Sequence, residues 1–268
     1  MTCPTLRLRR VWGTFYKSKG INNIFTINSN GRLQGTNYNK LWMDIKHYYI
    51  EQGDGFPLIL LHGNGEDSSY FVHQMEPFAQ HFHVIALDTR GHGQTPRGDA
   101  PFTIRQFAKD LLEFMNQRGI EKANILGFSD GGNIAMVFSL AHPERVHKLV
   151  LNGANLNASG VKKTVQIPIE IGYRIAKRFA KKNPEARKNA EILELMVNEP
   201  NVEPNELKRI QSPTLVIAGD KDTIKDSHTR LIAAQIPKSE LQIIPGNHFI
   251  ASKNPEMFNE VVLRFLLR

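Results

Sequence analysis

The stretch Ala-Asn-Ile-Leu-Gly-Phe-Ser-Asp-Gly-Gly at residues 123–132 decides the fold. Its first half is an apolar run typical of a strand that is buried on both faces, and a helical stretch follows the last glycine. A chain that reverses so sharply from strand to helix leaves no room for a Cβ atom at Gly127 or Gly131. Such a turn lifts the hydroxyl of Ser129 above the carboxyl ends of parallel strands, where the sites of α/β proteins lie.

A serine hydroxyl is a weak nucleophile until a base takes its proton, so the chemistry needs a histidine that is held by a carboxylate. Two downstream loops offer these groups. The loop GDKD at 219–222 follows the apolar run TLVIAG, and NHF at 247–249 follows LQII. Both are expected at the same edge of the sheet as Ser129. The chain order Ser129, Asp222, His248 is the order that this strand–turn–helix arrangement uses.

The oxyanion that forms after nucleophilic attack needs hydrogen-bond donors. The loop HGNG at 62–65 offers the backbone amide of Asn64, and the amide of Asp130 at the head of a helix offers a second. The Asp130 carboxylate either stabilises the positive helix end, by roughly 0.3–1 kcal/mol, or recognises the substrate. Phe128 and Phe249 are expected to line the substrate pocket or to fill core.

Short apolar runs alternate with amphipathic stretches from residue 43 onward, which predicts a mostly parallel central sheet flanked by helices. The expected strands are 47–51, 58–61, 83–87, 124–127, 148–151, 214–218 and 241–244. The expected helices lie near 68–80, 103–118, 131–141, 226–235 and 254–267. Thr103 is expected to cap the second of these helices and Gly119 to end it.

The alternation breaks after residue 152, where two helical patterns follow one another without a strand between them. We interpret this segment, at about 153–211, as a small helical lid over one end of the sheet. The first pattern places four apolar residues on one helix face: Ile167, Ile171, Ile175 and Phe179. Residues 161–188 hold nine basic and two acidic residues. This charge run is either the solvated face of a helix or an attractive surface for an anionic substrate or a membrane.

Five motifs resemble those of the α/β-hydrolase superfamily over residues 43–268: HGNG at 62–65, DTRGHGQT at 88–95, GFSDGG at 127–132, GDKD at 219–222 and NHF at 247–249. The resemblance implies the α/β-hydrolase fold, with an eight-stranded sheet, a lid after the sixth strand, and acyl-enzyme hydrolysis without metal or cofactor. It also implies that Ser129 is the nucleophile and His248 the base. The family spacing G-x-x-D selects Asp222 over Asp220 as the acid.

The motif GFSDGG is also similar to that of amino-acid-ester hydrolases related to valacyclovir hydrolase. In those enzymes an acidic residue next to the nucleophile recognises the α-amino group of the substrate. The resemblance therefore implies that Asp130 binds a small, positively charged ester. His62 and His92 lack a second ligand at metal-binding spacing, so we interpret both as residues that organise loops, and no metal site is expected.

Composition narrows the class of protein. The 268 residues are 41% hydrophobic and 22% charged, which excludes global disorder and suits one large α/β domain. The single cysteine, Cys3, excludes an internal disulfide framework and fits a reducing compartment. No apolar run approaches the roughly 18 residues of a membrane span. We therefore expect a soluble, cytoplasmic protein.

The net charge of +8 is concentrated at the beginning of the chain. Residues 1–42 hold seven basic residues and no acidic one, which leaves 27 basic and 26 acidic residues in the remainder. We interpret 1–42 as a poorly ordered basic extension, with a basic arm that contacts an anionic surface as the alternative. Because the body of the chain is nearly neutral, nucleic acid is not expected as a partner.

Together these patterns predict a serine hydrolase that cleaves a small carboxylic ester, thioester or amide through an acyl-enzyme. Two alternatives stay open. The same triad serves carbon–carbon bond hydrolysis, acyl transfer and perhydrolysis in related enzymes, and a non-catalytic ligand-binding protein could use the same fold.

Overall fold

The computed structural model describes residues 24–27, 33–36 and 44–268 of the chain. The chain divides into two compact units, Met1–Trp42 and Met43–Arg268. In the first, strand β1 (Ile24–Ile27) pairs antiparallel with β2 (Leu33–Thr36). The prediction that this segment is poorly ordered concerns residues that lie mostly outside the described ranges, and it stays a prediction.

The second unit is built around a seven-stranded sheet in the order β3-β5-β4-β6-β7-β8-β9. Strand β3 is antiparallel to β5, and all other neighbouring strands are parallel. This confirms the mostly parallel sheet, but the expected number of eight strands is wrong for the described residues. The strands are β3 (Tyr49–Gln52), β4 (Pro57–Leu61), β5 (His83–Leu87), β6 (Ala123–Phe128), β7 (Val146–Asn152), β8 (Thr214–Gly219) and β9 (Ser239–Ile244).

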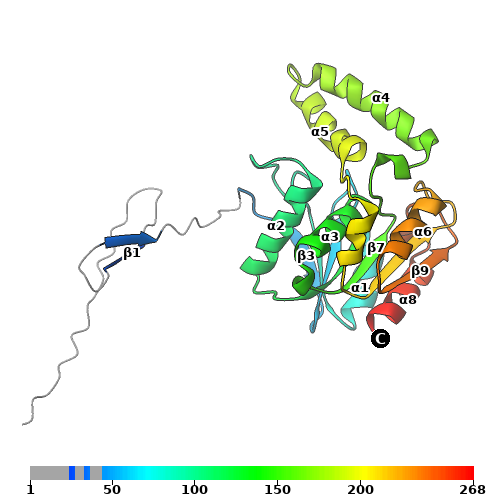
Figure 1. The fold of residues 1–268 in the computed structure, drawn as a ribbon, viewed down its shortest axis with the longest axis horizontal. Coiled ribbons are helices and arrows are strands. Elements are labelled where there is room, and N and C mark those ends of the chain that lie inside the picture. Colours follow the sequence, from blue (N-terminus) through cyan, green and yellow to red (C-terminus); the bar gives the residue numbers. More distant parts are fainter. Residues whose placement is uncertain (1–23, 28–32, 37–43) are drawn as a thin grey trace, which may run out of the picture. The chain divides into compact units, whose positions relative to one another are not determined.

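Helices cover both faces of the sheet (Figure 1). Side chains alternate along a strand, so Ile59 and Leu61 of β4 pack with α2, α3 and α6, whereas Leu58 and Leu60 pack with α1, α7 and α8. The helices are α1 (Val72–Ala79), α2 (Ile104–Gln117), α3 (Asp130–Ala141), α4 (Lys163–Phe179), α5 (Pro184–Asn198), α6 (Asp226–Gln235), α7 (Ile250–Lys253) and α8 (Pro255–Leu266), with short 3-10 helices at Ser68–Phe71, Pro143–Arg145, Ala158–Gly160 and Pro204–Arg209. Within the described part of the chain, no helix combines the length and the apolarity needed to cross a bilayer.

Local capping decides where the helices begin and end. The hydroxyl of Thr103 accepts a hydrogen bond from the amide of Gln106, so the predicted N-cap of α2 is confirmed. Gly119 follows α2 with a φ of 66°, which confirms it as the terminating residue. The helix expected near 68–80 divides into a 3-10 turn and α1, and the one expected near 254–267 is α8, preceded by the separate short helix α7.

Residues 153–213, here called the helical insertion, lie between β7 and β8 and contain α4 and α5. The two helices pack against each other at one end of the sheet (Figure 1). The side chain of Asn183 caps α5, and Pro184 occupies its first position. The apolar stripe of α4 is present as the spacing predicts, but it faces solvent.

Candidate active site

The turn at Ser129 joins β6 to α3 in a conformation that only a tightly packed environment sustains. Ser129 has a φ of 53° and a ψ of −120°, which is strained for a residue with a side chain. A Cβ atom at Gly127 would lie 2.1 Å from the carbonyl oxygen of Gly131, and one at Gly131 would lie 2.0 Å from that of Leu61. The expectation that both positions exclude a side chain is therefore confirmed.

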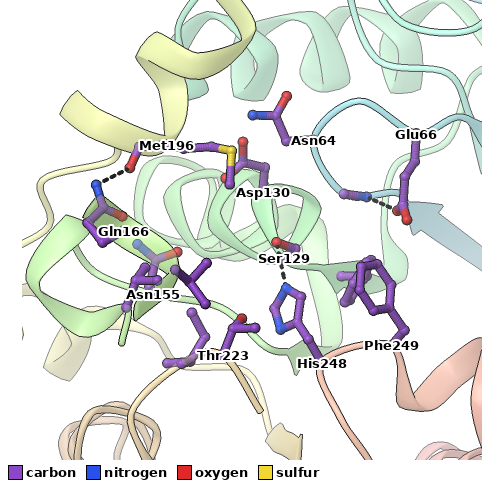
Figure 2. Close-up of a pocket in the computed structure, with 15 residues that line it drawn as sticks. Asn64, Glu66, Ser129, Asp130, Asn155, Gln166, Met196, Thr223, His248 and Phe249 are labelled. Carbon is purple, nitrogen blue, oxygen red and sulfur yellow. Dashed lines mark hydrogen bonds between the residues drawn. The ribbon is translucent and has the colours of Figure 1, made fainter. Parts of the chain in front are cut away.

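Three of the predicted residues meet in one hydrogen-bonded line at the carboxyl ends of the strands. The Nε2 atom of His248 lies 3.0 Å from the hydroxyl of Ser129, and its Nδ1 atom lies 2.7 Å from a carboxylate oxygen of Asp222. Figure 2 shows the imidazole directed at the serine. Asp220 instead accepts a hydrogen bond from the amide of Gly246. The structure thus brings Asp222, and not Asp220, to the histidine.

The surroundings of Asp222 favour its ionised form. Burial raises the pKa of the Asp222 carboxyl, but the hydrogen bond and the charge of His248 outweigh burial and hold the pKa below its ordinary value. The amide of Ile224 also donates to this carboxylate, at 2.8 Å. An ionised Asp222 orients a proton on Nδ1 of His248, which leaves Nε2 free to accept a proton from the serine.

The HGNG loop lies beside the serine, and its conformation is fixed by the hydrogen bonds of its buried first residue, His62. The Nε2 atom of His62 accepts a hydrogen bond from the amide of Thr89, and its Nδ1 atom donates to the carbonyl of Gly63. Burial lowers the pKa of His62 to about 4, so the ring is neutral. His62 therefore organises the loop, as expected. The Asn64 side chain donates to the carbonyl of Ile192 in α5, at 2.8 Å.

Two backbone amides near the serine are available as donors. No acceptor among residues 44–268 engages the amide of Asn64. Asp130 begins α3, and the first amides of a helix have no partner within it. Both amides are therefore free to donate to a substrate, and their role as donors to an oxyanion stays a prediction.

Charged side chains hold the loop after β5 in place. Asp88 accepts hydrogen bonds from two backbone amides, those of Ser68 and Gln94. The guanidinium of Arg90 is 1% exposed and forms a two-pronged pair with Asp110 and another with Asp44. His92 belongs to the same loop, and its Nδ1 atom donates a hydrogen bond to the carbonyl of Arg90, at 3.0 Å. No cluster of metal-binding side chains occurs in the described residues.

A cavity of about 260 Å³ opens onto Ser129. The predicted residues Asn64, Asp130 and Phe249 line it (Figure 2). Phe128 also lines it. Phe128 is fully buried and stacks on Tyr70 with ring centres 4.4 Å apart, whereas Phe249 is 41% exposed. The helical insertion contributes five residues to the wall: Asn155, Val161, Val165, Gln166 and Met196.

The charged groups that line this cavity are acidic. One oxygen of Asp130 accepts a hydrogen bond from Asn133, and the other is buried without a partner among the described residues. Burial raises the pKa of Asp130 to about 6 and that of Glu66 to about 7. No lysine or arginine of residues 44–268 lines the cavity, so the nine basic residues of 161–188 lie outside it.

Sequence reasoning missed Glu66, Gln166 and Met196. Glu66 directly follows the HGNG motif, and its carboxylate accepts a hydrogen bond from the amide of Gly63. The position of Glu66 directly after this motif was the sequence signal that could have identified it. Gln166 and Met196 reach the cavity through the packing of α4 and α5 over the sheet. No motif marks them.

Known proteins share this architecture. A family model described as the alpha/beta hydrolase fold matches residues 57–192. The chain is 27% identical over 252 residues to the 2-hydroxy-6-oxo-6-(2'-aminophenyl)hexa-2,4-dienoic acid hydrolase of Metapseudomonas resinovorans, across 82% of this chain and 87% of that protein.

Two solved structures extend the likeness to three dimensions. The first is Est816, described as an N-acyl homoserine lactone degrading enzyme, which matches with 29% identity and a TM-score of 0.67, over 82% of this chain and 97% of that one. The second, the enol-lactonase of Burkholderia xenovorans LB400, matches with 22% identity and a TM-score of 0.71, over 84% and 97%. The family model spans half of the chain, and the chain therefore belongs to the alpha/beta hydrolase fold family and is a hydrolase.

Proposed function

We propose that the chain is a serine hydrolase that cleaves a small carboxylic ester, thioester or amide through an acyl-enzyme. Ser129 is the nucleophile, His248 the general base and Asp222 the acid that orients it. The observation that carries the proposal is the unbroken hydrogen-bonded line from Asp222 through His248 to Ser129 at the end of a cavity.

The reaction follows from these contacts. Ser129 Oγ attacks the substrate carbonyl carbon while its proton passes to Nε2 of His248, and the resulting imidazolium is stabilised by Asp222. The amides of Asn64 and Asp130 donate to the oxyanion. His248 then protonates the leaving group, which departs and leaves the acyl group on Ser129. Water, deprotonated by His248, then attacks the acyl-enzyme carbonyl; the bond to Ser129 Oγ breaks, His248 returns the proton to that oxygen, and the acid is released.

The cavity selects the substrate by size and by charge. Its volume of about 260 Å³ suits a small acyl group. Its acidic lining offers a carboxylate-bearing substrate no cationic partner among residues 44–268, which disfavours the acidic substrate class named for the Metapseudomonas resinovorans relative. Neutral esters fit, including lactones, the class named for the Est816 structure. The Asp130 carboxylate, whose residue lines the cavity, suits a substrate ammonium group.

The helical insertion acts as a lid in this proposal. It forms one wall of the cavity through Val165, Gln166 and Met196. The hydrogen bond from the Asn64 side chain to Ile192 also ties the insertion to the loop that carries an oxyanion donor. Closure of the insertion over the sheet and correct placement of that donor are therefore coupled.

Hydrolysis of p-nitrophenyl acetate by matched variants tests the proposal. Ser129→Ala is expected to lower kcat by a factor on the order of 10⁶. Asp222→Asn is expected to lower it by about 10⁴, because the histidine loses its oriented tautomer. Asp220→Asn makes the same chemical change two residues away and should keep kcat within about tenfold, because it does not touch the histidine. Retention of activity in Ser129→Ala, or equal losses in the two aspartate variants, would contradict the assignment.

A further inference from the structure

Helix α4 presents its apolar side to solvent. Four of its large apolar side chains, Ile167, Ile171, Ile175 and Phe179, are each between 51% and 57% exposed. The side of α4 that faces the protein is instead marked by the buried residues Gln166 and Tyr173. Figure 1 shows α4 as the outer helix of the insertion, beyond α5. A surface helix normally buries its apolar stripe, so this one lacks its partner.

Arginines lie directly beside the exposed stripe. Arg174 and Arg178 follow Ile171 and Ile175 by three residues, which places each arginine next to an isoleucine on the helix surface. Both arginines are exposed, and no carboxylate of the described residues pairs with either of them. The outer surface of α4 therefore combines an apolar stripe with an uncompensated basic edge.

Charge decides what can cover this surface. A second copy of the chain would bring the same excess of nine basic over two acidic residues in 161–188. Residues 1–42 carry seven basic residues and no acidic one, so they are repelled as well. An acidic substrate is not the target either, because none of the nine basic residues lines the cavity. An anionic lipid surface complements both the apolar stripe and the basic edge.

We propose that α4 is an interfacial helix that docks this hydrolase onto the surface of an anionic bilayer. The helix lies in the plane of the membrane, with the stripe from Ile167 to Phe179 among the headgroups and acyl-chain boundary, and with Arg174 and Arg178 at the lipid phosphates. Helix α4 also contributes Val165 and Gln166 to the cavity wall. Docking therefore brings a helix that lines the cavity to the membrane surface, close to molecules that partition there.

Vesicle co-sedimentation of the full chain tests the proposal. The wild type should bind vesicles of phosphatidylcholine and phosphatidylglycerol in equal parts, and it should bind phosphatidylcholine alone at least tenfold more weakly. Arg174→Gln/Arg178→Gln should lower the partition coefficient by about 30-fold, from about 1 kcal/mol for each cation at the surface. Ile171→Gln/Ile175→Gln should lower it by about tenfold or more.

Two control variants separate α4 from general effects of charge and hydrophobicity. Lys109→Gln/Lys122→Gln removes two exposed cations elsewhere, and Val72→Gln removes an apolar side chain that is 64% exposed. Both should bind the mixed vesicles within about threefold of the wild type. All variants should hydrolyse p-nitrophenyl acetate in solution as the wild type does, so a failure of docking is distinguishable from a failure of the catalytic proposal.

Three results would overturn the docking proposal. The first is wild-type protein that does not bind anionic vesicles. The second is an α4 arginine variant that loses no more binding than Lys109→Gln/Lys122→Gln. The third is a dimer, seen by light scattering, that Ile171→Gln/Ile175→Gln dissociates while vesicle binding is unaffected, because a second copy would then be the true occupant of the stripe.

Discussion

Replacing Asp130 with asparagine removes a buried carboxylate that has no partner for one of its oxygens. Burial raises the pKa of Asp130 from 3.8 to about 6. Each pKa unit corresponds to about 1.4 kcal/mol, so ionisation of this group at pH 8 costs the folded state up to about 3 kcal/mol. We expect Asp130→Asn to raise the free energy of unfolding at pH 8 by up to that amount.

The pH dependence of this gain identifies its cause. The folded-state pKa lies above the unfolded-state value, so the carboxyl is protonated in the folded protein at low pH. Its destabilising effect appears as the pH rises from about 4 to about 6. Urea denaturation of both proteins at pH 8 and at pH 4 should give a difference that shrinks to less than about 1 kcal/mol at the lower pH. A difference independent of pH, or a less stable variant at pH 8, would show that ionisation of buried Asp130 does not destabilise the folded state.

The same variant tests substrate recognition. A hydrogen bond to a charged group is worth about 1.5–3 kcal/mol, so Asp130→Asn should lower kcat/KM for an amino-acid ester by about 10- to 100-fold. The matched ester without the α-amino group should keep its kcat/KM within about threefold, since the orphan oxygen has no donor to meet there. Equal losses on the two substrates would show that Asp130 does not bind the ammonium group.

Three further predictions follow from contacts near the site. Gly131→Ala should lower Tm by at least about 5 °C, because the new Cβ atom would meet a backbone carbonyl at 2.0 Å. The control Gly172→Ala should leave Tm unchanged or higher in the same thermal scan, because the nearest neighbour of its Cβ atom lies at 3.5 Å. Arg90→Met should lower the free energy of unfolding, measured in urea, by about 3–5 kcal/mol, because Asp110 is left buried without its cation; an unchanged midpoint would argue against a structural ion pair. Glu66→Gln should weaken the decline in Tm that the wild type shows as the pH rises from about 5 through 7, because burial raises the pKa of Glu66 to about 7. An identical decline in both proteins would assign it to another group.

The sequence was informative wherever one residue type is required by local geometry. The turn at Ser129 tolerates only small neighbours, so its glycines identify it without knowledge of the rest of the molecule. The apolar runs at β4 and β8 are buried on both faces, which makes them recognisable as central strands. Because parallel strands end at one edge, loops that follow them converge, and Asp222 and His248 could be placed next to Ser129 in advance.

The features that escaped prediction depend on how distant segments pack. Gln166 and Met196 line the cavity only because α4 and α5 fold over the sheet, and no spacing rule encodes that docking. Helical periodicity located the stripe from Ile167 to Phe179 but carried no information on which side of α4 faces the protein. The unpartnered oxygen of Asp130 likewise became visible only when its neighbours were in place.

The most direct test of the central claim is the mass of the protein after reaction with a fluorophosphonate. Such a reagent forms a stable adduct only with a serine that is activated as a nucleophile. We expect a single adduct on the full chain, located by peptide mapping at Ser129, and no adduct on Ser129→Ala of normal stability. An adduct that persists in Ser129→Ala, or one that maps to another residue, would contradict it.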